Sequence, residues 1–330
     1  MSIEEKLKTE YARKSRAING ASEMNPKVMA SFRKNSVAGR TRSYRKQTKT
    51  TRWTIGVVLA VIVLSGFAYG SSKLLADDKF GRWSFQLRTA SEDMTLDKAV
   101  LNEISTKREE IRSHLEPGES AYLYVSALAE SSHSLYRSMP MIGVFQPILI
   151  DEFEGAEQLL TQSGIGVIIP MELPNQFRFK HAYQGEADIS FSFTKDAPQI
   201  QQVLKKESKD TGKGITWMKI EDERKLLNKV TLIYSNAVGE QLSIMVEVIS
   251  SDEHNMNLIA PKSVQYEELK VKGLNAHYTS SDSVPFSKSH FYQNVMWTET
   301  AGNSQYVINI GTESSNVPKG ILVRAAEQLK

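Results

Sequence analysis

The sequence predicts a single-pass membrane protein with an α+β domain outside the membrane. We expect this domain to be a curved antiparallel sheet with helices on one side and a C-terminal helix packed on the sheet. Two observations support this fold class. About twenty residues after Arg52 carry no charge, which is the length that a helix needs to cross a bilayer. The last third of the chain alternates apolar and polar residues between turns and ends in a helical pattern.

The apolar segment 53–72 is the predicted membrane-spanning helix. Trp53 and Tyr69 lie near its ends, where aromatic side chains meet the membrane interface. A buried helix of a soluble core would carry polar residues on one face, and the middle of this segment has none. Residues 68–70 loosely resemble a signal-peptidase site, but fifty-two residues precede the segment, too many for an ordinary signal peptide. The sequence therefore favours an uncleaved anchor.

Charge asymmetry predicts the orientation of this helix. Residues 1–52 hold fourteen Lys or Arg and four Glu, a net charge of +10; since the whole chain carries +3, the remaining residues carry −7. Positive flanks stay inside, so we expect a cytoplasmic N-terminus and an extracytoplasmic C-terminal domain at the cell membrane. The basic residues expected to rest on the lipid bilayer are Arg42, Arg45, Lys46, Lys49 and Arg52. This distribution does not suggest nucleic acid, and the chain has no cysteine for disulfides.

The tail 1–52 contains two short helical patterns. The second begins at Pro26, a favourable first helical residue, and places Val28, Met29 and Phe32 on one side. Such a small apolar stripe cannot stabilise a helix by itself, so a cytoplasmic protein partner would have to cover it. The alternative is that the tail is only a solvated basic flank at the membrane surface.

The region outside the predicted anchor divides into three parts. Residues 73–93 are predicted to form a juxtamembrane spacer. Residues 94–200 are predicted to form an α+β part. A helix is predicted from residue 95 until Pro117 and Gly118 end its pattern, followed by a strand from Ser120, a helix over 148–162 and a buried strand over 164–170. Residues 186–196 alternate like a half-buried strand.

Residues 201–330 are predicted to form an antiparallel sheet closed by a helix. Two strands flank Asn236–Gly239, a four-residue hairpin connection, and three more alternating segments follow. The stretch 318–330 has an apolar helical face that can cover the sheet. The residues predicted to share one core are Trp297, Tyr306, Ile308 and Leu322.

Motifs that would indicate catalysis or a metal site are weak. The six histidines show no i, i+4 pair, so no zinc motif is present. Ser192 and Lys195 match the S-x-x-K spacing of penicillin-binding enzymes, but that chemistry needs a helix, and this segment alternates like a strand. The glutamates near residues 152–157 are explained by a solvated helix face. The sequence therefore predicts neither an enzyme, nor a cofactor, nor a metal site.

Several stretches resemble a known family. They include "LEPGESAYLYV", "VTLIYSNAVGEQLSI", "ELKVKGLNAHYTS" and the closing "VMWTETAGNSQYVINIG…VPKGILVRAAEQLK". This pattern resembles the uncharacterised ectodomain family of single-pass, anti-sigma-factor-like or envelope-stress membrane proteins of Gram-positive spore-forming bacteria. The resemblance covers about residues 110–330 and implies a curved half-barrel sheet outside the membrane and a sigma factor as one candidate partner. Its motif residues are Val271, Gly273, Ala276, Tyr278, Trp297 and Tyr306.

Taken with this resemblance, the sequence predicts a non-enzymatic, membrane-anchored sensor or regulator. Its extracytoplasmic domain would bind an envelope ligand or protein, and its tail would meet a cytoplasmic partner. The alternative is a structural or assembly protein of the cell envelope whose tail acts only as an anchor.

Overall fold

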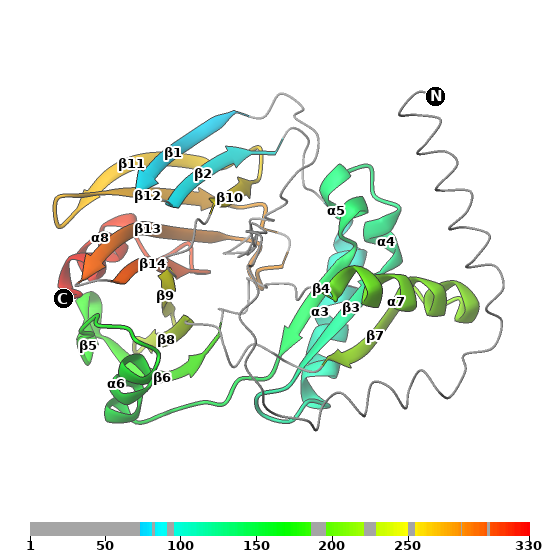
Figure 1. The fold of residues 1–330 in the computed structure, drawn as a ribbon, viewed down its shortest axis with the longest axis horizontal. Coiled ribbons are helices and arrows are strands. Elements are labelled where there is room, and N and C mark those ends of the chain that lie inside the picture. Colours follow the sequence, from blue (N-terminus) through cyan, green and yellow to red (C-terminus); the bar gives the residue numbers. More distant parts are fainter. Residues whose placement is uncertain are drawn as a thin grey trace, which may run out of the picture. The chain divides into compact units, whose positions relative to one another are not determined.

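The computed structural model describes most of the chain after residue 72 (Figure 1). The described residues are 73–80, 83–90, 96–185, 196–220, 229–249, 255–284, 286–301 and 304–330. The predicted tail 1–52 and the predicted spanning segment 53–72 lie outside these ranges, as does the predicted strand over 186–196 except for its last residue.

The strands and helices follow one another in a mixed order along the chain. The first half contains β1 (Leu74–Phe80), β2 (Trp83–Thr89), α3 (Lys98–Ser113), β3 (Ser120–Val125), α4 (Ser126–Ala129), α5 (Ser134–Ser138), β4 (Met141–Phe145), α6 (Phe153–Gln162), β5 (Glu172–Leu173), η1 (Pro174–Gln176) and β6 (Phe177–Gln184). The second half contains α7 (Ala197–Thr211), β7 (Ile215–Ile220), β8 (Lys229–Ser235), β9 (Gln241–Ile249), β10 (Asn255–Ala260), β11 (Gln265–Val271), β12 (Leu274–Ser281), β13 (Tyr292–Ala301), β14 (Ser304–Thr312) and α8 (Lys319–Gln328).

The largest sheet has eight strands in the order β11-β12-β13-β14-β9-β8-β6-β5, and every neighbouring pair in it is antiparallel. Local turn chemistry sets its hairpins. Lys272 and Gly273 both have positive φ between β11 and β12, as a two-residue type I′ turn requires. Between β8 and β9, the side chain of Asn236 accepts hydrogen bonds from the backbone N–H groups of Val238 and Glu240.

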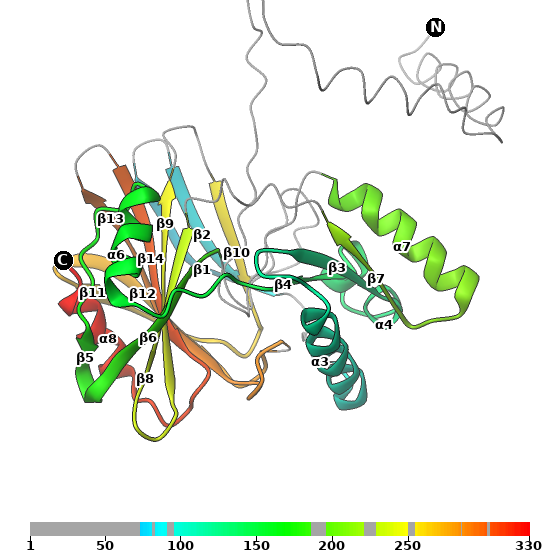
Figure 2. The ribbon, with the colours of Figure 1, turned by 90° about the horizontal axis from the view of Figure 1, so that it is seen from below.

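One face of this sheet carries the main hydrophobic core, and helices α6 and α8 cover it (Figure 2). Strand alternation places residues such as Val246 and Ile308 on this face, where Ile321 and Ala325 of α8 meet them. The four residues assigned to one core from the sequence, Trp297, Tyr306, Ile308 and Leu322, all lie in this cluster and are at most 3% exposed.

The opposite face of the eight-stranded sheet is covered by a second sheet of three strands, in the order β1-β2-β10. β1 and β2 are antiparallel, whereas β2 and β10 are parallel although about 170 residues separate them. Phe85 and Leu87 of β2 pack with Leu258 of β10 against Met296 and Val307 of the large sheet. The part of the eight-stranded sheet around β13 and β14 is therefore buried on both faces.

The third sheet, β4-β3-β7, forms the centre of a layered α/β part. All six residues of β3 are buried, because helix α3 packs on one face of the sheet and α7 on the other. α3 begins at Asp97, whose side chain accepts a hydrogen bond from the backbone N–H of Ala99 at 2.7 Å. α7 ends at Gly212, which has a φ of +68° as a left-handed helix cap requires.

The fold class predicted from the sequence, a single-pass membrane protein, is wrong for this structure. Of the described residues, 42% lie in strands and 28% in helices, so β-sheet is the main element of this part of the chain. Within the described residues, every helix is too short or too polar to cross a bilayer. The sheet also has a second sheet, rather than solvent, on the face opposite the helices. The predicted localisation and orientation rest on residues 53–72, outside the described ranges, and stay predictions.

Three predicted features differ from the structure: a spacer, a division between two parts, and a strand. Residues 73–93, predicted to be a spacer, contain strands β1 and β2. The predicted division at residue 200 falls inside α7, and β7 beyond it pairs with β3. Residues 164–170, predicted to be a buried strand, form no ladder, although their side chains alternate between buried and exposed. Ile168 makes two backbone hydrogen bonds with Lys330, which belongs to no strand.

Candidate functional site

The first candidate site is a cluster of Asp78, His277 and Tyr266, named here the histidine cluster, between the two packed sheets. Asp78 comes from β1, whereas Tyr266 and His277 come from the neighbouring strands β11 and β12. In the β11–β12 register Tyr266 lies opposite Thr279, two residues along from His277, so the two rings are diagonal neighbours on one face. Their interaction with Asp78 joins the three-stranded sheet to the eight-stranded sheet.

The hydrogen bonds of the histidine cluster define its proton arrangement. His277 Nε2 lies 2.5 Å from Asp78 Oδ2, and His277 Nδ1 lies 3.0 Å from the Tyr266 hydroxyl. An ionised carboxylate only accepts hydrogen bonds, so Nε2 carries the proton and donates a hydrogen bond to Asp78. In the neutral imidazole, Nδ1 is then an acceptor, and the Tyr266 hydroxyl donates to it. Both ring nitrogens are thus hydrogen-bonded within the chain.

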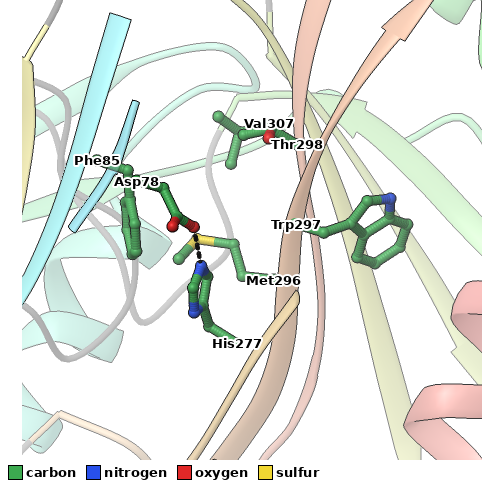
Figure 3. Close-up of a pocket in the computed structure, with 7 residues that line it drawn as sticks. All are labelled: Asp78, Phe85, His277, Met296, Trp297, Thr298 and Val307. Carbon is green, nitrogen blue, oxygen red and sulfur yellow. Dashed lines mark hydrogen bonds and ion pairs between the residues drawn. The ribbon is translucent and has the colours of Figure 1, made fainter. Parts of the chain in front are cut away.

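The space beside the histidine cluster is small (Figure 3). The cavity measures about 10 Å³, roughly the space that a single water requires. Phe85 stacks on the His277 ring with centroids 5.1 Å apart, and Met296 lies beside it. The indole of Trp297 points away toward the opposite face of the strand. This geometry suits a buried polar link between sheets better than the binding of a substrate.

The same environment perturbs Tyr266. Burial, together with the negative charges of Glu268 and Asp78, raises the pKa of its phenol to about 12. The hydroxyl therefore stays protonated at neutral pH and serves as the hydrogen-bond donor to His277. Burial also raises the pKa values of Tyr136, Tyr234 and Tyr292.

Stability is expected to fall as the pH rises from about 10 to about 12, because the unfolded tyrosine, with a pKa near 10.0, loses its proton before the folded Tyr266 does. In that window the folded state binds more protons than the unfolded state, so the free energy of unfolding decreases. Tyr266→Phe should make this decrease shallower, as measured by urea midpoints at a series of pH values. A midpoint that falls as steeply in Tyr266→Phe as in the unchanged protein would contradict the assignment.

The second candidate site is a groove between helix α3 and the loop 286–290, named here the α3 groove. Its volume is about 70 Å³. Arg108 Nη1 donates to the carbonyl oxygen of Phe286 at 3.2 Å, which joins the two walls across 178 residues of sequence. The α3 wall presents Asn102, Ser105, Arg108, Glu109 and Arg112. The opposite wall presents Ser287, Lys288, His290 and Glu313.

Hydrogen bonds hold the loop wall of the α3 groove in place. Glu313 Oε2 accepts from the Ser287 hydroxyl at 2.8 Å and from the backbone N–H of Lys288 at 2.7 Å. His290 has a φ of +59°, a left-handed conformation that is uncommon for a residue other than glycine. Its backbone donates to the Ser287 carbonyl and accepts from the Val284 N–H, which closes the loop. Strained residues of this kind are concentrated at functional sites.

The other site residues predicted from the sequence lie elsewhere. Val28, Met29, Phe32, Arg42, Arg45, Lys46, Lys49 and Arg52 lie outside the described residues. Ser192 and Lys195 also lie outside them. Within the ranges that the structure describes, no three His, Asp or Glu side chains are arranged to hold a metal ion. Sequence reasoning missed both candidate sites, since their parts come from segments far apart in the chain.

A scan against protein-family models found no match, and searches of curated proteins and of solved structures found none either. The family resemblance of the sequence therefore stays a prediction, and the functional argument rests on the geometry of the two candidate sites.

Proposed function

We propose that the described part of the chain is a non-enzymatic binding module, the sensing part of a regulator that recognises an envelope ligand or protein. The observation that carries this proposal is the α3 groove. Its hydroxyl, amide, guanidinium and ammonium groups come from two walls that are far apart in sequence. A few polar groups that converge in a concave site are typical of ligand recognition.

The histidine cluster supports a binding role over catalysis. A general acid or base must reach a proton of the substrate. His277 uses both ring nitrogens for Asp78 and Tyr266, and the adjacent cavity has room for about one water. We assign this cluster the role of holding the two sheets together.

The groove also suits the transmission of a signal. A ligand in it would contact α3 and the loop 286–290 at once, so binding would favour one arrangement of these two segments. A ligand shifts such an equilibrium by as much as its affinities for the two states differ.

Filling the groove tests this function. Ser105 is exposed and lines the groove, whereas its exposed neighbour Thr106 does not. In the native cell, Ser105→Trp should reproduce the transcript profile of a strain that lacks the protein, while Thr106→Trp should keep the unchanged profile. Both purified variants should melt within about 2 °C of the unchanged protein, because surface substitutions usually alter stability by at most about 0.5 kcal/mol.

Two outcomes would contradict the proposal. An unchanged transcript profile in the Ser105→Trp strain would show that the groove has no part in regulation. No difference between the unchanged strain and the strain that lacks the protein would favour a structural or assembly role in the envelope.

A further inference from the structure

Strand β7 forms an edge of the sheet β4-β3-β7 and pairs on one side only. Among the residues that the structure describes, no strand lies beyond it. β4, at the other edge, has four of its five residues buried. In β7, by contrast, Met218 is 37% exposed and the side chain of Lys219 is 52% exposed. An exposed edge strand presents backbone N–H and C=O groups that can pair with another strand.

One hydrogen bond at the start of β7 shows which of its backbone groups point outward. The N–H of Ser126 donates to the carbonyl oxygen of Gly214 at 2.9 Å, in the same register as the β3–β7 ladder. Hydrogen-bonded pairs alternate along an antiparallel ladder, so the even-numbered residues of β7 bond to β3. The backbone groups on the free edge therefore belong to Ile215, Trp217 and Lys219.

β7 has few of the charges that commonly protect an edge strand. β11, an edge of the eight-stranded sheet, carries Glu267, Glu268 and Lys270. Such charges oppose pairing with another chain. The sequence of β7, ITWMKI, has a single charged residue, Lys219, and this lysine forms an ion pair with Glu119 of the same chain. The composition of β7 therefore favours pairing at this edge.

The outward groups of β7 are complementary to those of a second copy of the same strand. In an antiparallel β7–β7 pair centred on Trp217, this residue lies opposite its own copy, and Ile215 lies opposite Lys219 of the second copy. Every outward N–H and C=O of these three residues is then hydrogen-bonded, because bonded pairs in such a ladder are two residues apart. No like charges face each other, and the two Trp217 rings are cross-strand neighbours.

We propose that the chain forms a symmetric dimer through β7, in which two sheets join into one of six strands in the order β4-β3-β7-β7-β3-β4. A two-fold axis through Trp217 generates this pairing, and isologous contacts of this kind are typical of homodimers. The partner is a second copy, since the hydrogen-bond register of β7 matches itself without a shift.

The same pairing covers an exposed apolar side chain. Met218 lies opposite Tyr122 of β3, which packs with Leu204 of α7, so Met218 is on the α7 face of the sheet. In the dimer Met218 lies opposite Thr216 of the second copy and loses solvent contact. One strand pair with its flanks makes a small interface, below about 1,200 Å². We therefore expect a dimer that dissociates on dilution.

Analytical ultracentrifugation of the purified full chain over a dilution series tests this proposal. Lys219→Pro removes one outward N–H and leaves the bonds to β3, a position where an edge strand tolerates proline. Lys219→Ala is the matched control, because it loses the same ion pair with Glu119 and keeps the N–H. Lys219→Pro should raise the dissociation constant of the dimer at least tenfold, and Lys219→Ala less than threefold. Circular dichroism checks that both variants are folded.

Single cysteines test the register, since the chain has no cysteine of its own. In Trp217→Cys the two thiols lie on opposite residues, whose Cα atoms are about 5.5 Å apart in a hydrogen-bonded pair, within reach of a disulfide. In Lys219→Cys, on the same face, the two positions are four residues apart along the pair, roughly 13 Å. Mild oxidation should give a covalent dimer in Trp217→Cys and not in Lys219→Cys.

Three results would overturn the dimer. They are a full chain that stays monomeric at every concentration, an equal weakening by Lys219→Pro and Lys219→Ala, and equal cross-linking of the two cysteine variants. If Lys219→Pro does not fold, the pair of cysteine variants decides by itself. None of these measurements involves the α3 groove, so the proposed binding function is judged separately.

Discussion

Deletion of residues 318–330 is expected to abolish the cooperative unfolding transition of the part that the structure describes. The deletion removes helix α8 and uncovers the face of the eight-stranded sheet on which it packs. The side chains lost from the core are Ile321, Leu322, Ala325, Ala326 and Leu329. Each large apolar side chain removed from a core costs about 2–5 kcal/mol, whereas a whole domain is stable by about 5–15 kcal/mol. The deletion also removes the two backbone hydrogen bonds between Lys330 and Ile168.

A pair of point variants on α8 separates the loss of stability caused by lost burial from any effect of shortening the chain. Leu322 is fully buried and Glu327 is exposed on the same helix. Leu322→Ala should lower the stability by about 2–5 kcal/mol, which corresponds to several degrees of melting temperature, whereas Glu327→Ala should change it by less than about 0.5 kcal/mol. Thermal unfolding followed by circular dichroism measures both. A truncated chain that melts at the unchanged temperature would show that α8 is not part of the core.

Local patterns predicted the hairpins and the last helix well. Alternation over β13 and β14 places Trp297 and Ile308 on the face that the stripe of α8 covers. Asn236 and Gly239 belong to a turn whose chemistry is readable from four residues. In these elements the periodicity, the turn and the final packing all depend on neighbours in the sequence.

The three-stranded sheet could not be predicted in this way. β1 contains Asp77 and Asp78, so its composition resembles a solvated spacer. The parallel pairing of β2 with β10 has no local signal, because their segments are about 170 residues apart. The sequence therefore left one face of the large sheet open, which the structure shows to be covered.

Residues 165–169 show why alternation alone is an incomplete signal. Ile165, Val167 and Ile169 are buried and Ile168 is 62% exposed, as a half-buried strand would be. A strand also needs a neighbouring strand for its backbone groups. Here Ile168 pairs with Lys330, while the N–H of Ile165 donates to the Leu160 carbonyl and that of Gly166 to the Tyr306 hydroxyl. Alternation of apolar residues reports burial of side chains, whereas a sheet requires hydrogen-bonded pairing as well.

The candidate sites depend on contacts that the sequence does not display. His277 and Asp78 are 199 residues apart, and Arg108 and Phe286 are 178 residues apart. Metal and catalytic motifs are recognised by the spacing of residues along the chain, and by that criterion each histidine is far from the others. The one sequence feature that marks His277 is its position in a strand whose alternate residues face the second sheet.

Gly311, near the end of β14, is the residue whose substitution should most disturb the large sheet. β14 lies between β13 and β9, and Gly311 lies opposite Asn294 on one side and Ser243 on the other. The ring of Tyr292, a buried side chain of β13, occupies the space where a Cβ at Gly311 would lie. A methyl group there would overlap the ring and hydroxyl of Tyr292, and backbone pairing on both sides restrains the strand from moving away.

Gly311→Ala is therefore expected to destabilise the fold by about 3 kcal/mol or more, at the upper end of what overpacking of a core costs. Chemical denaturation followed by tryptophan fluorescence measures the loss. Gly166→Ala is the matched control, because a Cβ at Gly166 would meet the Tyr306 hydroxyl at 3.5 Å, an ordinary contact. That variant should stay within about 1 kcal/mol of the unchanged protein.

A double-mutant cycle with Tyr292→Ala identifies the cause of the loss. Tyr292→Ala alone should cost about 3–5 kcal/mol, because it leaves a cavity the size of a buried aromatic ring. In the Gly311→Ala background the same change also removes the overlap, and the new methyl group fills part of the cavity. The double variant should therefore lose at least 1 kcal/mol less stability than the sum of the losses in the two single variants, as expected for residues in contact. Strict additivity would show that Gly311→Ala acts through the strand backbone, and that Tyr292 is not the side chain that requires a glycine there.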